Sequence, residues 1–150
     1  MDTKIKTEDW IYFAGLFDGE GCVSSCSSNL LILSLANTNK EVIEWIFNIF
    51  GGSITKQTPS AEDNKKVCWH WWLRAEEAVH ILQNILPFLK IKKRQAEIGI
   101  ELQKTICYKR PLPNSVKQTR EELRKKLRFL NKKGKKLIVE LELQSCLNES

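Results

Sequence analysis

Residues 13–21 read FAGLFDGEG, a stretch in which an apolar helix ends among three glycines. Asp18 and Glu20 stand at this end, where the backbone carbonyls of a helix carry partial negative charge and favour cations. An uncompensated acid here costs a few tenths to ~1 kcal/mol. The stretch therefore predicts a positive group, supplied from outside the sequence, that neutralises the two carboxylates.

The chain has 150 residues, 42% of them hydrophobic, and a formal net charge of +6. That length and composition predict one compact domain. The charge is uneven, because residues 87–136 hold 17 basic and 4 acidic side chains, whereas residues 1–86 hold 7 and 11. So basic a block indicates a polyanionic partner, with a solvated helix face as the alternative interpretation.

Several classes of protein fit the composition poorly. No apolar run approaches the roughly 20 residues that span a bilayer, and residues 1–10 lack the apolar core of a signal peptide. We therefore expect an intracellular protein without a membrane partner. Five cysteines without CxxC spacing indicate reduced thiols. Zinc bound by Cys22, Cys26, Cys68 and His70 is a weaker alternative, because this spacing matches no common ligand pattern.

Hydrophobic periodicity predicts the order helix, strand, strand, helix, strand, strand, helix, with more helices appended. Thr7 is the expected N-cap of the first helix, which the glycines at 19 and 21 end. One hairpin is expected over 21–37 and another from strands at 53–58 and 66–73. Helices are expected over 37–52, 75–86, 87–105 and 116–131, and the tail over 137–147 is interpreted as a helix, with a strand as the alternative. The fold class is α+β, with helices on one face of a sheet and the other face free.

The stretch FAGLFDGEG resembles the signature of the LAGLIDADG homing endonucleases, with Glu20 replacing an aspartate and Phe17 an isoleucine. The segments LSLANTNKEVIEW (33–45), FGGSI (50–54) and PFLKIKKRQA (87–96) resemble the family in the same order. The resemblance covers residues 10–105 well and the C-terminal third loosely. It implies one endonuclease domain over 1–150, with a core over about 7–105, a four-stranded antiparallel DNA-binding sheet, and basic helices and a loop over 106–150.

The glycines of the motif predict a second copy of the chain. Gly15 and Gly19 are four residues apart, so they lie on one helix face and allow another backbone to approach closely. The chain has one such motif, so we expect a homodimer around a two-fold axis. The expected interface residues are Phe13, Gly15, Leu16, Asp18 and Gly19, with Asp18 as a structural acid that hydrogen-bonds near the partner helix.

The resemblance also implies roles in phosphodiester hydrolysis. Glu20 and the backbone carbonyl of Gly19 would bind the metal, Asn39 would position the attacking water, and Lys92 would offset phosphate charge. Lys90 and Lys93 are alternatives to Lys92, and Ile43 stands where some relatives carry an arginine. Oxygen ligands select Mg²⁺, with Mn²⁺ as a substitute and Ca²⁺ expected to support binding without cleavage.

The free face of the sheet would lie in the DNA major groove, where base edges can be distinguished. Candidate contacts lie on this face, in the hairpin loops and in the cationic loop NKKGKK; for each of them, exposure without contact is the alternative. They are Ser24, Cys26, Ser28, Asn29, Leu30, Ile32, Ser34, Ala36, Ser53, Thr55, Gln57, Lys66, His70, Trp72, Lys132, Lys133, Lys135 and Lys136.

These inferences predict a homing endonuclease that makes a double-strand break with 3′ overhangs in a long pseudo-palindromic DNA site. Its role would be intron or intein mobility in a prokaryotic cytoplasm or an organelle, with no small-molecule substrate. One alternative is a non-catalytic nucleic-acid binder on the same scaffold, either an intron RNA maturase or a transcription regulator. Another is a basic protein-interaction module.

Overall fold

A computed structural model describes residues 4–107 and 110–132 of the chain. The elements are α1 (Thr7–Glu20), β1 (Gly21–Ser25), β2 (Leu31–Asn37), α2 (Lys40–Phe50), β3 (Ser53–Gln57), β4 (Cys68–Arg74), α3 (Ala75–Ile85), α4 (Lys93–Lys104), a 3-10 turn (Thr105–Cys107) and α5 (Asn114–Asn131). This confirms the predicted α+β order. Within the described ranges, no helix is long and apolar enough to cross a membrane.

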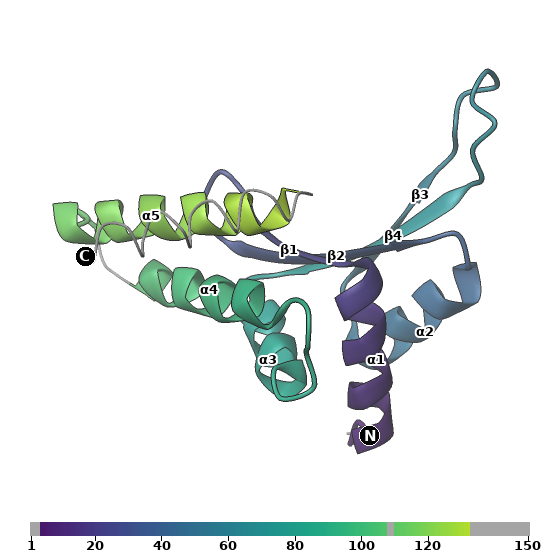
Figure 1. The fold of residues 1–150 in the computed structure, drawn as a ribbon, viewed down its shortest axis with the longest axis horizontal. Coiled ribbons are helices and arrows are strands. Elements are labelled where there is room, and N and C mark those ends of the chain that lie inside the picture. Colours follow the sequence, from purple (N-terminus) through teal and green to yellow (C-terminus); the bar gives the residue numbers. More distant parts are fainter. Residues whose placement is uncertain (1–3, 108–109, 133–150) are drawn as a thin grey trace, which may run out of the picture.

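The four strands form one antiparallel sheet in the order β1-β2-β4-β3. The two hairpins meet through β2 and β4, which pair from Ile32 opposite Arg74 to Asn37 opposite Trp69. Helices α1 to α4 lie on one side of this sheet (Figure 1). Among the described residues, the predicted arrangement is confirmed, with helices on one face of the sheet and an open opposite face.

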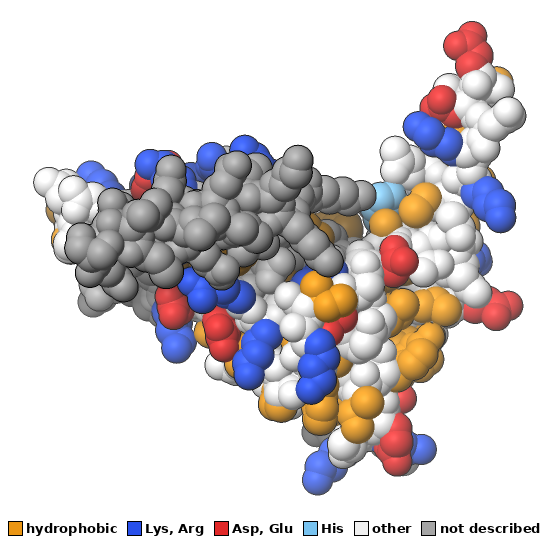
Figure 2. Space-filling model, in the orientation of Figure 1, with side chains coloured by type: hydrophobic (Ala, Val, Ile, Leu, Met, Phe, Trp, Pro, Cys, Tyr) orange, Lys and Arg blue, Asp and Glu red, His pale blue; other side chains and the backbone are white. Residues whose placement is uncertain are grey.

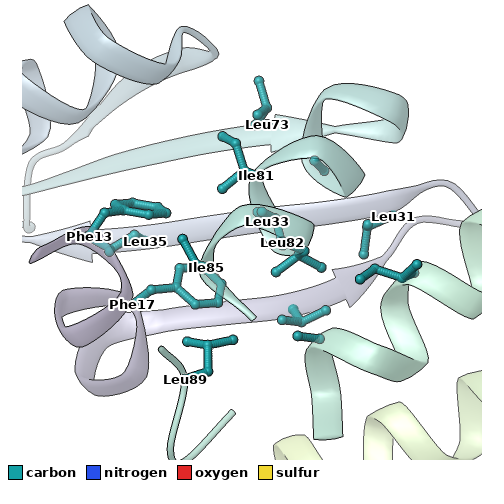
Figure 3. Packing of buried hydrophobic residues seen from close by; sticks show 14 of the residues in the cluster. Phe13, Phe17, Leu31, Leu33, Leu35, Leu73, Ile81, Leu82, Ile85 and Leu89 are labelled. Carbon is teal, nitrogen blue, oxygen red and sulfur yellow. The ribbon is translucent and has the colours of Figure 1, made fainter. Parts of the chain in front are cut away.

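Alternation along the strands determines which face is buried. Leu31, Leu33 and Leu35 are fully or almost fully buried, and they pack with Phe13 and Phe17 of α1 in the core between the sheet and the helices (Figure 3). Residues 32, 34 and 36 of β2 alternate with them and are half-exposed on the open face. The period of two in β2 therefore predicts its two faces correctly.

Local signals around α2 explain its ends. Asn39 is the N-cap, and its side-chain oxygen accepts a hydrogen bond from the Val42 N–H at 3.2 Å. Gly51 and Gly52 have φ angles of +73° and +93°, which favour glycine. The Gly51 carbonyl accepts a hydrogen bond from the Trp71 indole at 2.7 Å, so the turn after α2 is joined to the core.

Two predicted boundaries were wrong, whereas the predicted end of α1 is confirmed at Gly21, its C-cap. Thr7 is the first residue of α1 rather than its cap, and the N-cap, Lys6, makes no side-chain capping bond. Helix α1 continues to Glu20, so both acids of the motif lie in its last turn. Helix α4 begins at Lys93 rather than Pro87, because the backbone of residues 90–92 turns its amides toward Asp18.

Helix α5 covers the outer edge of the sheet beside β1 (Figure 1). At its end, the Asn131 amide donates a hydrogen bond to the Val23 carbonyl at 2.7 Å. Helix α4 packs closely against the sheet, because a Cβ at Gly99 would lie 2.8 Å from side-chain atoms of both Leu31 and Val23. The expected basic helix over 116–131 is confirmed, and the tail over 137–147 lies outside the described residues.

Candidate active site and nucleic-acid interface

The carboxylate of Asp18 finds its hydrogen-bond donors within its own chain. Its carboxylate accepts three backbone hydrogen bonds, from Lys90 at 2.7 Å, Ile91 at 3.2 Å and Lys92 at 3.0 Å. Only 8% of the residue is exposed. Successive amides that converge on one anion, just before a helix begins, form a favourable anion-binding arrangement. The expectation that Asp18 needs a positive group from outside the sequence is therefore wrong.

Lys92 is held against the end of α1. Its ammonium donates a hydrogen bond to the Asp18 carbonyl oxygen, one of the carbonyls at the negative end of the helix. Asp18 binds the Lys92 amide as well, so backbone and side chain are fixed from the same residue. Among the three candidate lysines, this contact distinguishes Lys92 from Lys90 and Lys93, both of which are exposed.

Among the described residues, Glu20 is the acid of the motif that has no partner. It is exposed in the last turn of α1 and forms no ion pair within the described ranges. Gly19, beside it, is exposed too, and its carbonyl belongs to the last turn of the helix. A carboxylate and a carbonyl are hard oxygen ligands that suit Mg²⁺, although a single chain provides only part of a coordination shell.

Acidic, histidine and cysteine side chains do not gather into a metal site elsewhere in the described part of the chain. Within residues 4–107 and 110–132, no group of three or more of these residues could hold a metal ion. In particular, Cys22 lies on β1 and Cys68 on β4, with β2 between the two strands. The zinc alternative is therefore wrong.

The glycines of α1 face open space. An added Cβ at Gly15 or Gly19 would meet nothing within 4 Å, and both residues are exposed. On the same helix Tyr12 is 54% exposed, so an apolar side chain accompanies the glycines. Phe13, in contrast, is fully buried in the core, and its predicted place in a dimer interface was wrong. Leu16 is half-exposed.

Asn39 has a structural role that the motif comparison did not predict. Its side chain caps α2, and α2 begins near one end of the sheet, whereas α1 ends beneath its middle (Figure 1). One chain therefore does not bring Asn39 beside Glu20. Ile43, which stands where some relatives are expected to carry an arginine, is fully buried, so its side chain does not face a substrate.

The open face carries the expected side chains in register. Cys22, Ser34, Trp72 and Ser53 lie in one row across the sheet, and Ala36, His70 and Thr55 lie in another. His70 Nε2 lies 2.8 Å from Gln57 Oε1, a hydrogen bond between the two strands. A groove of about 560 Å³ on this face is lined by Ile32, Ser34, Thr55, Gln57, His70, Trp72 and Arg74.

Arg74 is missing from the sequence-based set of contacts. It follows His70 and Trp72 at a spacing of two, so the alternation that placed those residues on the open face also indicates it. Of the remaining candidates, Ser24 lies on the open face, opposite Ile32, and the others lie in loops, after α5 or outside the described residues. Ser24 is on β1; Cys26, Ser28, Asn29 and Leu30 are in the turn after it; Lys66 is in the β3–β4 loop; Lys132 follows α5; Lys133, Lys135 and Lys136 lie outside the described residues.

Basic side chains border the open face. Figure 2 shows Lys and Arg side chains along α5 and on the β3–β4 hairpin, which extends beyond the helices. Such flanking charge suits a polyanion that lies along the sheet.

The pKa values of two thiols, Cys22 on β1 and Cys26 in the turn after it, shift in opposite directions. A hydrogen bond with Ser28 lowers the pKa of Cys26, whereas burial raises the pKa of Cys22, an effect that the Lys92 ammonium partly offsets.

The structure is similar to solved structures of homing endonucleases. I-CvuI in complex with its target gives a TM-score of 0.66 at 21% identity over 86% of this chain and 85% of that one. The archaeal intron-encoded enzyme I-Vdi141I, complexed with DNA, gives 0.69 at 19% over 85% and 86%. I-TnaI gives 0.59 at 15% over 97% of both chains. No family model and no curated protein matches the chain.

The fold is therefore that of the homing endonucleases. It is the LAGLIDADG fold that the motif at residues 13–21 predicted, with the motif on α1 and the four-stranded antiparallel sheet above it.

Proposed function

We propose that the protein is a homodimeric, divalent-metal-dependent DNA endonuclease that breaks both strands of a long, near-palindromic site. The observation that carries this proposal is the contrast between the two acids of α1. The Asp18 carboxylate accepts hydrogen bonds from three backbone amides, and the Asp18 carbonyl holds the Lys92 ammonium. Glu20, in contrast, remains exposed at the end of the same helix. An exposed acid in the same last helical turn as the carbonyl that holds Lys92 suits phosphodiester chemistry better than a structural role.

The open glycines support the homodimer. A glycine inside a helix destabilises the helix by about 0.5–1 kcal/mol relative to alanine. No atom of the described chain would clash with a Cβ at Gly15 or Gly19, so packing within one chain does not explain these glycines. A second helix packed against them would explain both residues. Two-fold symmetry would then bring the two Glu20 carboxylates to one end of the interface and complete the oxygen ligands that one chain lacks.

In this site Glu20 and the Gly19 carbonyl would hold Mg²⁺. The bound metal would polarise the scissile phosphate and lower the pKa of a water molecule. Lys92 would place its ammonium where negative charge develops on the phosphate oxygens, and its contact with Asp18 fixes it there before the substrate binds. The role of Asn39 in positioning water remains a prediction.

The open face would bind duplex DNA in the major groove, and the cationic flanks would contact phosphates. I-CvuI in complex with its target and I-Vdi141I complexed with DNA support DNA as the partner. I-CvuI structures were obtained with Ca and with Mg, which supports a divalent cation in the site. Insertion of an intron or intein into DNA is the biological role that we propose for the cut.

Site selection from a randomised DNA library tests the proposal. The protein is incubated with the library in Mg²⁺, the cleaved ends are sequenced, and the consensus site is placed in a plasmid. We expect linearisation in Mg²⁺, binding without cleavage in Ca²⁺, and two chains per duplex. Selective binding without cleavage in Mg²⁺ or Mn²⁺ would instead indicate the non-catalytic binder, and binding indifferent to sequence would indicate a basic interaction module.

A further inference from the structure

The strands of the sheet carry two cationic side chains, Lys56 and Arg74. Lys56 lies opposite Trp69 in the register, and its ammonium is 5.6 Å from the centroid of that ring, which packs against the core. Arg74 alternates with His70 and Trp72 on β4 and lines the groove of the open face. Arg74 is therefore the cation that the strands present to that face.

Trp72 holds the Arg74 side chain in place. The guanidinium carbon lies 4.6 Å from the centroid of the Trp72 ring, within the range of a cation–π contact. Trp72 is itself half-buried between Ser34 and Ser53 on the neighbouring strands. An arginine that already rests on a supported ring loses less side-chain entropy when it binds a ligand.

The charge of Arg74 is left for a ligand. Within the described ranges it forms no ion pair with a carboxylate, and its neighbours in the groove are neutral side chains such as Ile32, Ser34 and Thr55. It also lies on β4, an inner strand of the sheet, opposite Ile32 of the other inner strand. With DNA bound to the open face, this position would face the base edges on the floor of the DNA major groove rather than the phosphates at its rims.

We propose that Arg74 is a specificity-determining residue that reads one guanine in each half-site, with Trp72 as its platform. This inference rests on the proposed function of the open face. The planar guanidinium donates two parallel hydrogen bonds, which match the O6 and N7 acceptors of guanine in the major groove. The two acceptors are presented together by guanine alone among the four bases, so the contact selects sequence and not charge alone.

The experiment compares bound sequences rather than cleaved ones. A randomised duplex pool is incubated with the full chain in Ca²⁺, and the bound fraction is sequenced for the wild type, Arg74→Ala and Arg74→Lys. The matched control is Lys56→Ala, which removes a stacked cation from the same sheet but from the other face. Circular dichroism and thermal unfolding establish that each variant is folded.

We expect the wild type to prefer guanine at one symmetric pair of positions, by about tenfold or more over the other bases. Arg74→Ala and Arg74→Lys should lose that preference and keep all the others, and Lys56→Ala should keep the whole profile. Trp72→Leu, which leaves the arginine but removes its platform, should weaken the guanine preference.

Two results would overturn the inference while the proposed function stands. One is a guanine preference that Arg74→Ala leaves unchanged. The other is a uniform loss of affinity across all sequences in that variant, which would make Arg74 a phosphate contact. If the wild type enriches no sequence at all, the proposed function fails first and this inference fails with it.

Discussion

Replacing Asp18 by asparagine should loosen the loop over residues 90–92 and release Lys92 from the end of α1. The carboxylate accepts three charge-assisted hydrogen bonds from backbone amides in a site where the residue is 8% exposed. Hydrogen bonds to charged groups contribute about 1.5–3 kcal/mol each, against about 0.5–1.5 kcal/mol for neutral pairs.

Asparagine keeps one acceptor oxygen, so the amides of Ile91 and Lys92, which share Oδ1, retain weaker bonds. The Lys90 amide would face an NH₂ group and lose its acceptor, which costs about 1–3 kcal/mol for a buried donor. Together these effects predict a loss of about 3 kcal/mol in the free energy of unfolding. For a chain of this length, that loss lowers Tm by roughly 6–12 °C.

The assay is thermal and urea unfolding at one protein concentration, with hydrogen exchange of the amides at residues 90–92. Asp63→Asn is the matched control, because its carboxylate lies on the exposed β3–β4 loop, 3.9 Å from Lys65. The control should stay within about 0.5 kcal/mol of the wild type. If Asp18→Asn were equally stable, with the three amides equally protected, the account of Asp18 as the anchor of this loop would be wrong.

Three further predictions concern α1 and the thiols. Gly15→Ala should weaken dimerisation about tenfold or more in sedimentation equilibrium, because the new methyl group separates the two helices, although it favours the helix of a single chain. Gly21→Ala should destabilise the fold by about 1–3 kcal/mol in urea unfolding, because its Cβ would lie 2.3 Å from the Phe17 ring. Cys26 should be alkylated readily by iodoacetamide near neutral pH, since its lowered pKa raises the thiolate fraction. Ser28→Ala removes the hydrogen bond that is the main cause of the lowered pKa, so it should raise the pKa of Cys26 and slow the alkylation.

Each of these has a control within the chain. Asn48→Ala, on the exposed surface of α2, should leave the dimer dissociation constant unchanged. A wild-type dissociation constant for Gly15→Ala would contradict the proposed glycine contact. Equal stability of Gly21→Ala would show that Phe17 moves freely. Cys22 should react more slowly than Cys26, because burial raises the pKa of Cys22 whereas the Ser28 hydrogen bond lowers the pKa of Cys26, so equal rates would contradict the assigned environments.

Local signals predicted most of the fold. Asn39 and Gly51 set the ends of α2, and the alternation of Leu31, Leu33 and Leu35 assigned the faces of β2. These features depend on residues that are close in sequence, where capping, φ preference and periodicity act. Wrong boundaries arose where a distant partner intervened, as at Pro87, which starts no helix because Asp18 holds the following loop.

The residue types of the candidate site were predictable from the sequence, but the contacts of each residue were not. The sequence pattern treated Asp18 and Glu20 as two acids with one need. Asp18 finds its partners 72 to 74 residues away, a separation at which no local pattern operates, so only the family resemblance gave Asp18 a structural role, and the structure identifies its partners within the same chain. Burial likewise removes Phe13 from the interface, since the apolar pattern of α1 does not show which side faces the core.

The central claim is that Glu20 serves hydrolysis and not folding, and Glu20→Gln tests it most directly. The variant and the wild type are compared on the duplex selected from the library, by gel shift in Ca²⁺ and by cleavage in Mg²⁺. We predict affinity within about threefold of the wild type and a cleavage rate at least roughly 100-fold lower, because the neutral amide is a poor ligand for Mg²⁺. Cleavage by Glu20→Gln at the wild-type rate would contradict the account.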